Sequence, residues 1–173
     1  VTAYAATGWQ QNGSTYYYYD ANGELHKGWL NTENGYYYLN LSTGKMTVGW
    51  EKINNKWYYF QGNGVMVTGW VKDNGKYYYL LTDGTMHTGW VSIDNVYYYL
   101  SDSGAMATGW VNMDNGWYYF DPNDGKCTVN LAREINDSWY MFGKDGKMLT
   151  GWQQVDGAYY YFHTDGRMLI GWL

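Results

Sequence analysis

The sequence predicts an all-β fold, a repeat solenoid of stacked β-hairpins with about eight repeats of 20–21 residues. Three observations predict it: a recurring Gly-Trp pair, a block of aromatic residues after each pair, and a turn signal between the two. The chain of 173 residues contains 22 Tyr, 11 Trp and 23 Gly but only one Pro, so its frequent turns must rely on glycine.

The Gly-Trp pair sets the period. Its tryptophan recurs every 20 or 21 residues, apart from one interval of 42 residues, which is twice 21. One repeat has therefore lost its pair, and we expect a degenerate repeat at residues 121–150 within a single module over residues 1–173. The tryptophans are Trp9, Trp29, Trp50, Trp70, Trp90, Trp110, Trp152 and Trp172.

Each repeat has the pattern of a short hairpin. An aromatic block follows most of the tryptophans after seven residues, and a pair of residues suited to positive φ lies between them. An isolated two-stranded hairpin is marginal in water, so each hairpin must bury its faces on its neighbours. The predicted turn pairs are Asn34-Gly35, Asn54-Asn55, Asn74-Gly75, Asp94-Asn95, Asn115-Gly116 and Asp156-Gly157.

The hairpin register predicts which rings share a face. With the turn at Asn54-Asn55, Trp50 pairs with Tyr59 and lies on the same face as Trp57. Phe60 then points to the opposite face. We expect the core of the solenoid to contain Tyr59, Tyr79, Tyr99, Tyr119, Phe60, Leu80, Leu100 and Phe120.

Stacking of hairpins predicts a small aromatic box at each junction. Tyr78 of the next repeat should meet Trp50 and Trp57, and Met66 on the connecting segment should close the box as a polarisable wall. An electron-rich box without a carboxylate suits a quaternary ammonium, at roughly 0.5–2 kcal/mol per cation–π contact. A core selected only for packing would favour Leu, Ile and Val over rings with polar tips.

The pattern closely resembles the choline-binding (cell-wall-binding) repeats of streptococcal surface proteins, autolysins and phage lysins. The residues that carry it run from Thr68-Gly69-Trp70 through Tyr77-Tyr78-Tyr79-Leu80 to Gly84-Thr85-Met86-His87-Thr88-Gly89-Trp90, and the resemblance covers essentially the whole chain. It implies a left-handed superhelix that binds choline or phosphocholine of teichoic and lipoteichoic acids. Two rings of each site come from one repeat and a third ring from the next.

The resemblance assigns five complete sets of site residues, each made of three rings and a fourth wall. They are Trp9, Tyr16 and Tyr37 with Leu25; Trp29, Tyr36 and Tyr58 with Met46; Trp50, Trp57 and Tyr78 with Met66; Trp70, Tyr77 and Tyr98 with Met86; and Trp90, Tyr97 and Tyr118 with Met106. We number the sites by the hairpin that supplies the first ring. The run Tyr16 to Tyr19 leaves a one-residue slip of register open in the first site.

The last repeats depart from this pattern. The sixth set, Trp110, Trp117 and Tyr140, has Cys127 at the methionine position. In the seventh, Val129-Asn130 replaces Gly-Trp, so Trp139, Tyr160 and Met148 lack a first ring and we expect an empty or very weak box. Trp152 and Tyr159 have no aromatic block after them within this sequence.

Composition and charge exclude other classes. A net charge of −5 and a pI near 5.0 argue against nucleic acid as a partner. Cys127 is the only cysteine, which excludes an intrachain disulfide and a cysteine metal cluster, and no apolar run reaches the length of a membrane span. The carboxylates suit turns and the three histidines are scattered, so we expect no enzyme, no metal and no cofactor.

Ala3-Tyr4-Ala5 has the form of a secretory cleavage site, which together with the resemblance predicts an extracellular location on the bacterial cell wall. A carbohydrate (glucan)-binding repeat module is the alternative, because sugars also stack on aromatic rings. A structural spacer is a third interpretation. The exposed ends of a hairpin stack also leave open a homodimer through a terminal hairpin.

Overall fold

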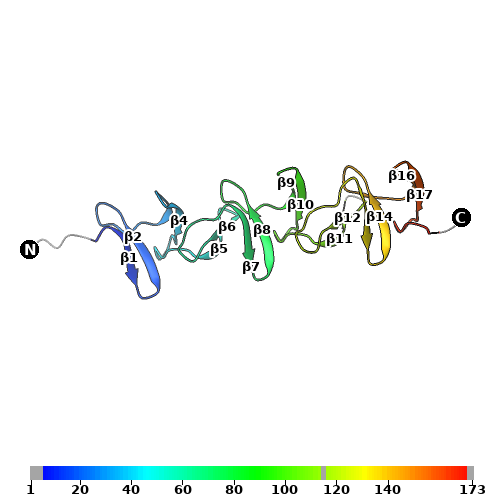
Figure 1. The fold of residues 1–173 in the computed structure, drawn as a ribbon. Helices are drawn as coiled ribbons and strands as arrows, with labels where there is room; N and C mark the ends of the chain where they lie inside the picture. The colour runs from blue at the N-terminus through cyan, green and yellow to red at the C-terminus, as the bar shows by residue number, and fades with distance from the viewer. Residues whose placement is uncertain (1–5, 114–115, 171–173) are drawn as a thin grey trace, which may run out of the picture. The chain divides into compact units, whose positions relative to one another are not determined.

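A computed structural model describes residues 6–113 and 116–170, in which the chain forms seventeen β-strands and no helix. Ala3-Tyr4-Ala5 and Trp172 lie outside these residues. The chain divides into two compact units, Val1–His87 and Thr88–Leu173. In each unit, consecutive hairpins follow one another along the chain, so the predicted all-β hairpin-repeat fold is confirmed (Figure 1).

The first unit contains four antiparallel hairpins, drawn from blue to green in Figure 1. Every strand has five residues, and each strand pairs only with its hairpin partner within the described residues. The hairpins are β1 (Gly8–Asn12) with β2 (Thr15–Tyr19), β3 (Gly28–Thr32) with β4 (Gly35–Leu39), β5 (Gly49–Ile53) with β6 (Lys56–Phe60), and β7 (Gly69–Asp73) with β8 (Lys76–Leu80).

The second unit also contains four hairpins, one of which gains a third strand. They are β9 (Gly89–Ile93) with β10 (Val96–Leu100), β11 (Gly109–Met113) with β12 (Gly116–Phe120), β13 (Leu131–Ile135) with β14 (Ser138–Phe142), and β16 (Gly151–Val155) with β17 (Ala158–Phe162). The short strand β15 (Met148–Leu149) pairs with β14.

Five of the described hairpin turns use two residues with positive φ, as type I′ turns require. Asn54 and Asn55 have φ values of 49° and 63°. The turns Asn74-Gly75, Asp94-Asn95 and Asp156-Gly157 likewise lie where the sequence predicts them. The predicted turn Asn34-Gly35 is wrong by one residue, because Gly35 pairs with Thr32 and the turn is Glu33-Asn34. Residues 114–115 of the remaining turn are not described.

The register of the hairpins agrees with the prediction. Trp50 pairs with Tyr59, and Lys52 pairs with Trp57. The first hairpin follows the same rule, since Trp9 pairs with Tyr18 and Gln11 with Tyr16, so no slip occurs there.

The glycine of Gly-Trp is required by the backbone. Gly49 has φ of 79°, a conformation that an L side chain rarely adopts. In the seventh hairpin the first strand position belongs to Leu131, which pairs with Phe142, and Ala132 occupies the tryptophan position. The prediction that Val129-Asn130 replaces Gly-Trp is therefore wrong by two residues. The chain inserts one residue before this hairpin, and Asn130 takes the positive φ of 49° that a leucine would not tolerate.

In every hairpin but the first, whose Tyr19 is only partly buried, the last residue of the second strand lies in the core of its unit. Phe60, Phe120 and Phe142 are fully buried, and Leu80 and Phe162 are 1% exposed. Tyr119 is also buried, whereas Tyr59, Tyr79 and Tyr99 are only partly buried. Rows of single large apolar side chains therefore hold the hairpins together.

After each hairpin, the chain turns at a glycine and returns along the second strand. Phe60 forms a β-bridge with Met66, and the same bridge recurs in the other hairpins. The Met66 amide also donates a hydrogen bond of 2.7 Å to the carbonyl of Tyr36 in the preceding hairpin. The connecting segments thus place four methionines beside their own hairpin and the hairpin before it: Met46, Met66, Met86 and Met168.

Candidate aromatic binding sites

The structure brings together the first and third rings in the first, second, third, fifth and sixth of the predicted sets. Each first-ring tryptophan contacts a tyrosine of the following hairpin, with ring centroids 4.8–5.1 Å apart. Most of these pairs are edge-to-face, the arrangement that the ring quadrupoles favour. The pairs are Trp9 and Tyr37, Trp29 and Tyr58, Trp50 and Tyr78, Trp90 and Tyr118, and Trp110 and Tyr140.

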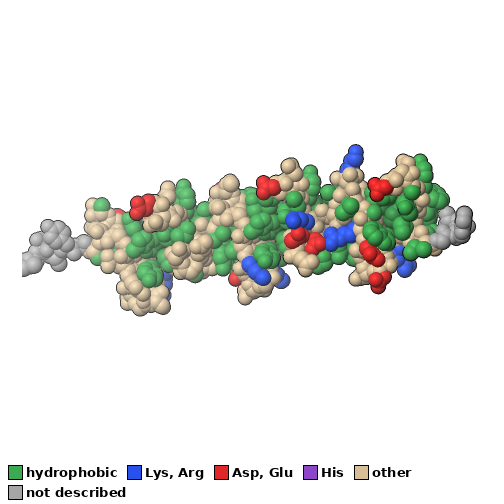
Figure 2. Space-filling view, in the orientation of Figure 1, with side chains coloured by type: hydrophobic (Ala, Val, Ile, Leu, Met, Phe, Trp, Pro, Cys, Tyr) green, Lys and Arg blue, Asp and Glu red, His purple; other side chains and the backbone are tan. Residues whose placement is uncertain are grey.

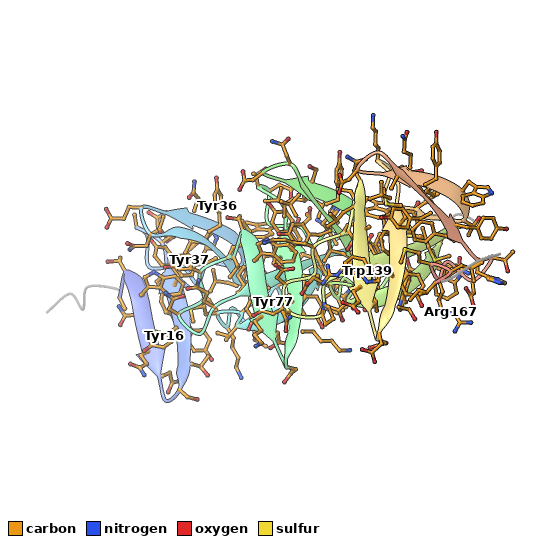
Figure 3. The ribbon with its side chains drawn as sticks, turned by 45° about the vertical axis from the view of Figure 1, so that its right-hand side comes forward. Tyr16, Tyr36, Tyr37, Tyr77, Trp139 and Arg167 are labelled. Atoms are coloured by element: carbon orange, nitrogen blue, oxygen red, sulfur yellow. The ribbon has the colours of Figure 1, made fainter. Side chains whose placement is uncertain are left out.

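The second ring of each set stands at the surface. Figure 3 labels Tyr16, Tyr36 and Tyr77 at this position, and each has at least 38% of its side chain exposed. Trp117 lies 6.3 Å from Trp110 at an angle of 84°, so the two inner faces form a corner. Green apolar side chains reach the molecular surface along both units in Figure 2. The second rings are therefore available to a ligand.

The fourth wall differs from the prediction. Met46, not Leu25, lines the cavity of the first site, together with Trp9, Tyr16 and Tyr37. The Met46 amide donates a hydrogen bond of 2.8 Å to the Tyr16 carbonyl, which holds it there.

The same displacement by one repeat holds elsewhere within each unit. The Met66 amide donates a hydrogen bond to the Tyr36 carbonyl, and the Met86 amide donates one to the Trp57 carbonyl. Met148 packs against the same buried cluster as Trp110 and Tyr140. The assignments of Met46 to the second site and Met66 to the third are therefore wrong. The physical reason is that each connecting segment returns along its own hairpin and reaches back to the preceding one.

Cys127 consequently belongs to the fifth site rather than the sixth. Its amide donates to the Tyr97 carbonyl, and its side chain lines a cavity of about 280 Å³ with Trp90, Tyr97 and Tyr118. Met106 is thus not the wall of this site. Burial raises the pKa of the Cys127 thiol to about 11, so the thiol is neutral and apolar at pH 7.

Charged residues also lie at these sites, contrary to the expectation of boxes without carboxylates. Lys144 and Asp145 line the fifth cavity. In the third hairpin, the Lys52 ammonium lies 5.9 Å from the centroid of the Trp57 ring. In the second site, burial and the negative charge of Asp83 raise the pKa of Tyr58, which keeps the phenol neutral.

The assignment of Met86 to the fourth site is wrong for the same reason as those of Met46 and Met66, since its amide donates to the Trp57 carbonyl in the third site. The three rings of the fourth set draw on both units, with Trp70 and Tyr77 in the first and Tyr98 in the second. That set of rings stays a prediction. At the seventh junction, Trp139 and Tyr160 line a cavity of about 570 Å³ together with Ala132, and the fourth wall is Met168 rather than Met148. In the eighth hairpin, Trp152 and Tyr159 are 59% and 68% exposed.

Several hydrogen-bonded carboxylates serve turns, whereas Asp73 accepts a bond from the Trp50 indole and Asp121 accepts one from Arg133. Asp83 accepts hydrogen bonds from the amide and hydroxyl of Thr85, and these bonds lower the pKa of the Asp83 carboxyl. Asp165 likewise accepts hydrogen bonds from the amide and the guanidinium of Arg167, which is labelled in Figure 3. Among the described residues, no group of three or more His, Cys, Asp or Glu side chains could hold a metal ion. The same part of the chain contains no helix of the length and apolarity that a membrane span needs.

Comparison with protein families identifies the class. A profile of the choline-binding repeat matches residues 47–87, 87–131 and 149–173, and a profile of a cell wall binding repeat matches residues 7–25 and 133–148. The first profile alone covers more than half of the chain. The chain therefore belongs to the choline-binding repeat family.

Solved structures agree with this assignment. CbpJ from Streptococcus pneumoniae is 36% identical with a TM-score of 0.87, and the match covers 95% of this chain and 58% of that chain. Choline binding protein F from the same organism, solved in the presence of a peptidoglycan analogue, is 35% identical with a TM-score of 0.86 and the same coverage. A pneumococcal cell wall endolysin from phage Cp-1, complexed with choline, is 38% identical over 71% of this chain and 37% of that chain, with a TM-score of 0.51.

The chain thus spans somewhat more than half the length of the first two of these structures. No sequence among the curated proteins compared matches the chain significantly.

Proposed function

We propose that this chain is a non-catalytic module that attaches a protein to the bacterial cell wall by binding choline or phosphocholine of teichoic acids. The observation that carries the proposal is the repeated contact between a tryptophan of one hairpin and a tyrosine of the next, at 4.8–5.1 Å in five junctions. Membership of the choline-binding repeat family supports it. The module is accordingly extracellular.

The chemistry of the sites suits a trimethylammonium group. Such a group cannot donate an N–H hydrogen bond, so it gains from ring faces and from leaving water rather than from polar partners. In the first site, Trp9, Tyr16 and Tyr37 supply ring faces and Met46 supplies a polarisable wall around a cavity of about 480 Å³. The exposed second ring leaves room for the rest of the ligand to remain in solvent.

Several weak sites on one stack suffice for attachment. A wall polymer that carries choline at intervals engages a second site at a high effective concentration once the first is occupied. Modest affinity at each site is therefore compatible with firm attachment.

Thermal unfolding followed by near-ultraviolet circular dichroism tests the proposal. Millimolar choline chloride should raise the unfolding midpoint relative to the same concentration of sodium chloride, because a ligand of the native state stabilises it. A glucan oligosaccharide in place of choline is the comparison. A midpoint raised by the oligosaccharide but not by choline would reverse the proposal in favour of a carbohydrate-binding module.

A further inference from the structure

We propose that the cavity between the seventh and eighth hairpins binds a neutral pyranose sugar rather than choline. This seventh-junction cavity of about 570 Å³ lies between β13–β14 and β16–β17, and its lining includes Trp139, Tyr160 and Ala132. It is larger than the cavities of the first and fifth sites, at about 480 and 280 Å³.

The loss of the first ring changes what this cavity can hold. Ala132 pairs with Met141 at the position where Trp50 pairs with Tyr59, so alanine stands in place of the indole that contacts the next hairpin. The equivalent of Tyr160 in the first site, Tyr37, is only 7% exposed because Trp9 covers it, whereas Tyr160 is 38% exposed. A cation here would lose one of three ring faces.

Two rings and several apolar side chains remain in the lining. Trp139 on β14 (Figure 3) is 39% exposed and faces the cavity from one hairpin, while Tyr160 on β17 faces it from the other. Phe162, Met141 and Met168 complete the apolar lining, and Met168 is held by a hydrogen bond of 2.8 Å from its amide to the Trp139 carbonyl. These walls suit a flat ligand with apolar faces.

Polar groups reach the cavity from both hairpins. Asn130 lies at the base of the seventh hairpin, and Gln154 and Asp156 lie near the tip of the eighth. Amide side chains can donate to and accept from hydroxyl groups, and a carboxylate can accept from them, whereas a trimethylammonium group offers none of them a hydrogen bond. A pyranose ring has apolar C–H faces and hydroxyl edges, so it matches aromatic walls flanked by polar groups.

Indole N–H signals in ¹H–¹⁵N NMR spectra of the full chain can test this site. The probes are triacetylchitotriose, isomaltotriose and choline chloride, titrated separately. At least one trisaccharide should shift the Trp139 indole signal while leaving that of Trp29 in the first unit unchanged. A Trp139 indole that responds to choline and to neither sugar would overturn the inference, as would one that responds to no probe.

Two variants place the effect in this cavity. Ala132→Trp should restore the missing first ring, fill the space beside Tyr160 and abolish the sugar response of Trp139. Asn130→Gly keeps the backbone at positive φ, removes one polar group and should weaken sugar binding about fivefold, as the loss of one hydrogen bond predicts. Asn136→Gly, at the same φ of 49° but outside the cavity lining, is the matched control and should bind as the parent does.

The Asn130 pair keeps the test decisive even if Ala132→Trp does not fold. Equal sugar affinity in Asn130→Gly and Asn136→Gly would contradict the assignment. The inference does not depend on choline binding at the other sites, because the two ligands are titrated separately and report on different indoles.

Discussion

Replacement of Trp57 separates the ligand site from the packing of the stack. Trp50 packs on Tyr59 of its own hairpin at 5.0 Å and on Tyr78 of the next hairpin at 4.9 Å, whereas Trp57 is 41% exposed. Trp57→Leu removes the second ring of the third site but keeps an apolar side chain. Trp57→Tyr retains a ring, and tyrosine occupies this position in the second hairpin as Tyr36.

The expected size of the effect follows from the ring contacts. One cation–π face is worth about 0.5–2 kcal/mol, and since 1.4 kcal/mol is tenfold, the third site should bind choline about 2- to 30-fold more weakly. A site saturated at ten times its Kd stabilises the native state by about 1.4 kcal/mol, and by only about 0.4 kcal/mol once its Kd rises tenfold. The choline-dependent part of the unfolding free energy should therefore fall by about 1 kcal/mol.

The assay is chemical unfolding followed by tryptophan fluorescence, with and without choline, for the parent and both variants. The difference between the two conditions cancels the direct cost of the substitution to the fold, which is about 1–2 kcal/mol for a partly buried ring. Trp57→Tyr should keep most of the choline increment and Trp57→Leu should lose about 1 kcal/mol of it. Equal increments in the parent and in Trp57→Leu would refute the three-ring site.

Three further predictions concern the turns, the ion pair and the thiol. Gly64→Ala should unfold more easily than Gly69→Ala and should weaken the first site: both glycines have positive φ, but only at Gly64 would a Cβ lie 2.3 Å from the sulfur of that site's methionine. Equal chemical stability would contradict that contact. Arg133 donates a hydrogen bond to Asp121 and lowers the pKa of its carboxyl, so this pair stabilises the fold above the unfolded pKa of about 4 and the contribution disappears as pH falls through the lower folded value. Arg133→Ala should therefore lose more stability at pH 7 than below both pKa values, by about 1 kcal/mol or less, measured by urea unfolding. The loss that remains at low pH reflects the Arg133 hydrogen bond to Thr128 and its contact with the Tyr119 ring; a loss that is independent of pH would contradict this linkage. Cys127 should react slowly with a thiol reagent until the pH approaches its pKa of about 11, and rapid labelling of the folded chain at pH 7 would show that the thiol is not buried.

Much of the fold could be predicted from local chemistry. The pairing of Trp50 with Tyr59 follows from the turn at Asn54-Asn55, because two residues of positive φ determine the register of a hairpin. Contacts between Trp50 and Tyr78 follow in turn from the alternation of side chains and the stacking of equal repeats. These steps use only neighbouring elements.

The fourth wall could not be predicted in the same way. Its position depends on the path of the connecting segment, and hydrogen bonds to the preceding hairpin determine that path. The sequence signals the position of the methionine only through the glycine of the turn it packs against. Gly64 leaves space for Met46, which comes from the segment after the preceding hairpin. Nothing in the spacing alone shows that relation.

The seventh hairpin shows how an insertion changes a register. Trp139 stands seven residues after Ala132, the usual spacing between first and second rings, so counting back from the aromatic block finds the correct strand. Counting forward from the previous repeat arrives two residues early. The positive φ of Asn130 explains why the chain tolerates Leu131 where other hairpins have glycine.

The central claim is that choline binds between a tryptophan and the tyrosine of the next hairpin, against a methionine that reaches back from one repeat later. A ¹³C-methyl NMR titration of the full chain with choline tests it most directly, with the Met46 methyl and the Leu25 methyls as reporters of the first site. We predict that the Met46 signal shifts strongly, owing to ring-current changes between Trp9 and Tyr37, and that the Leu25 signals stay in place. A shift of Leu25 without Met46, or no methyl response to choline at all, would contradict the account.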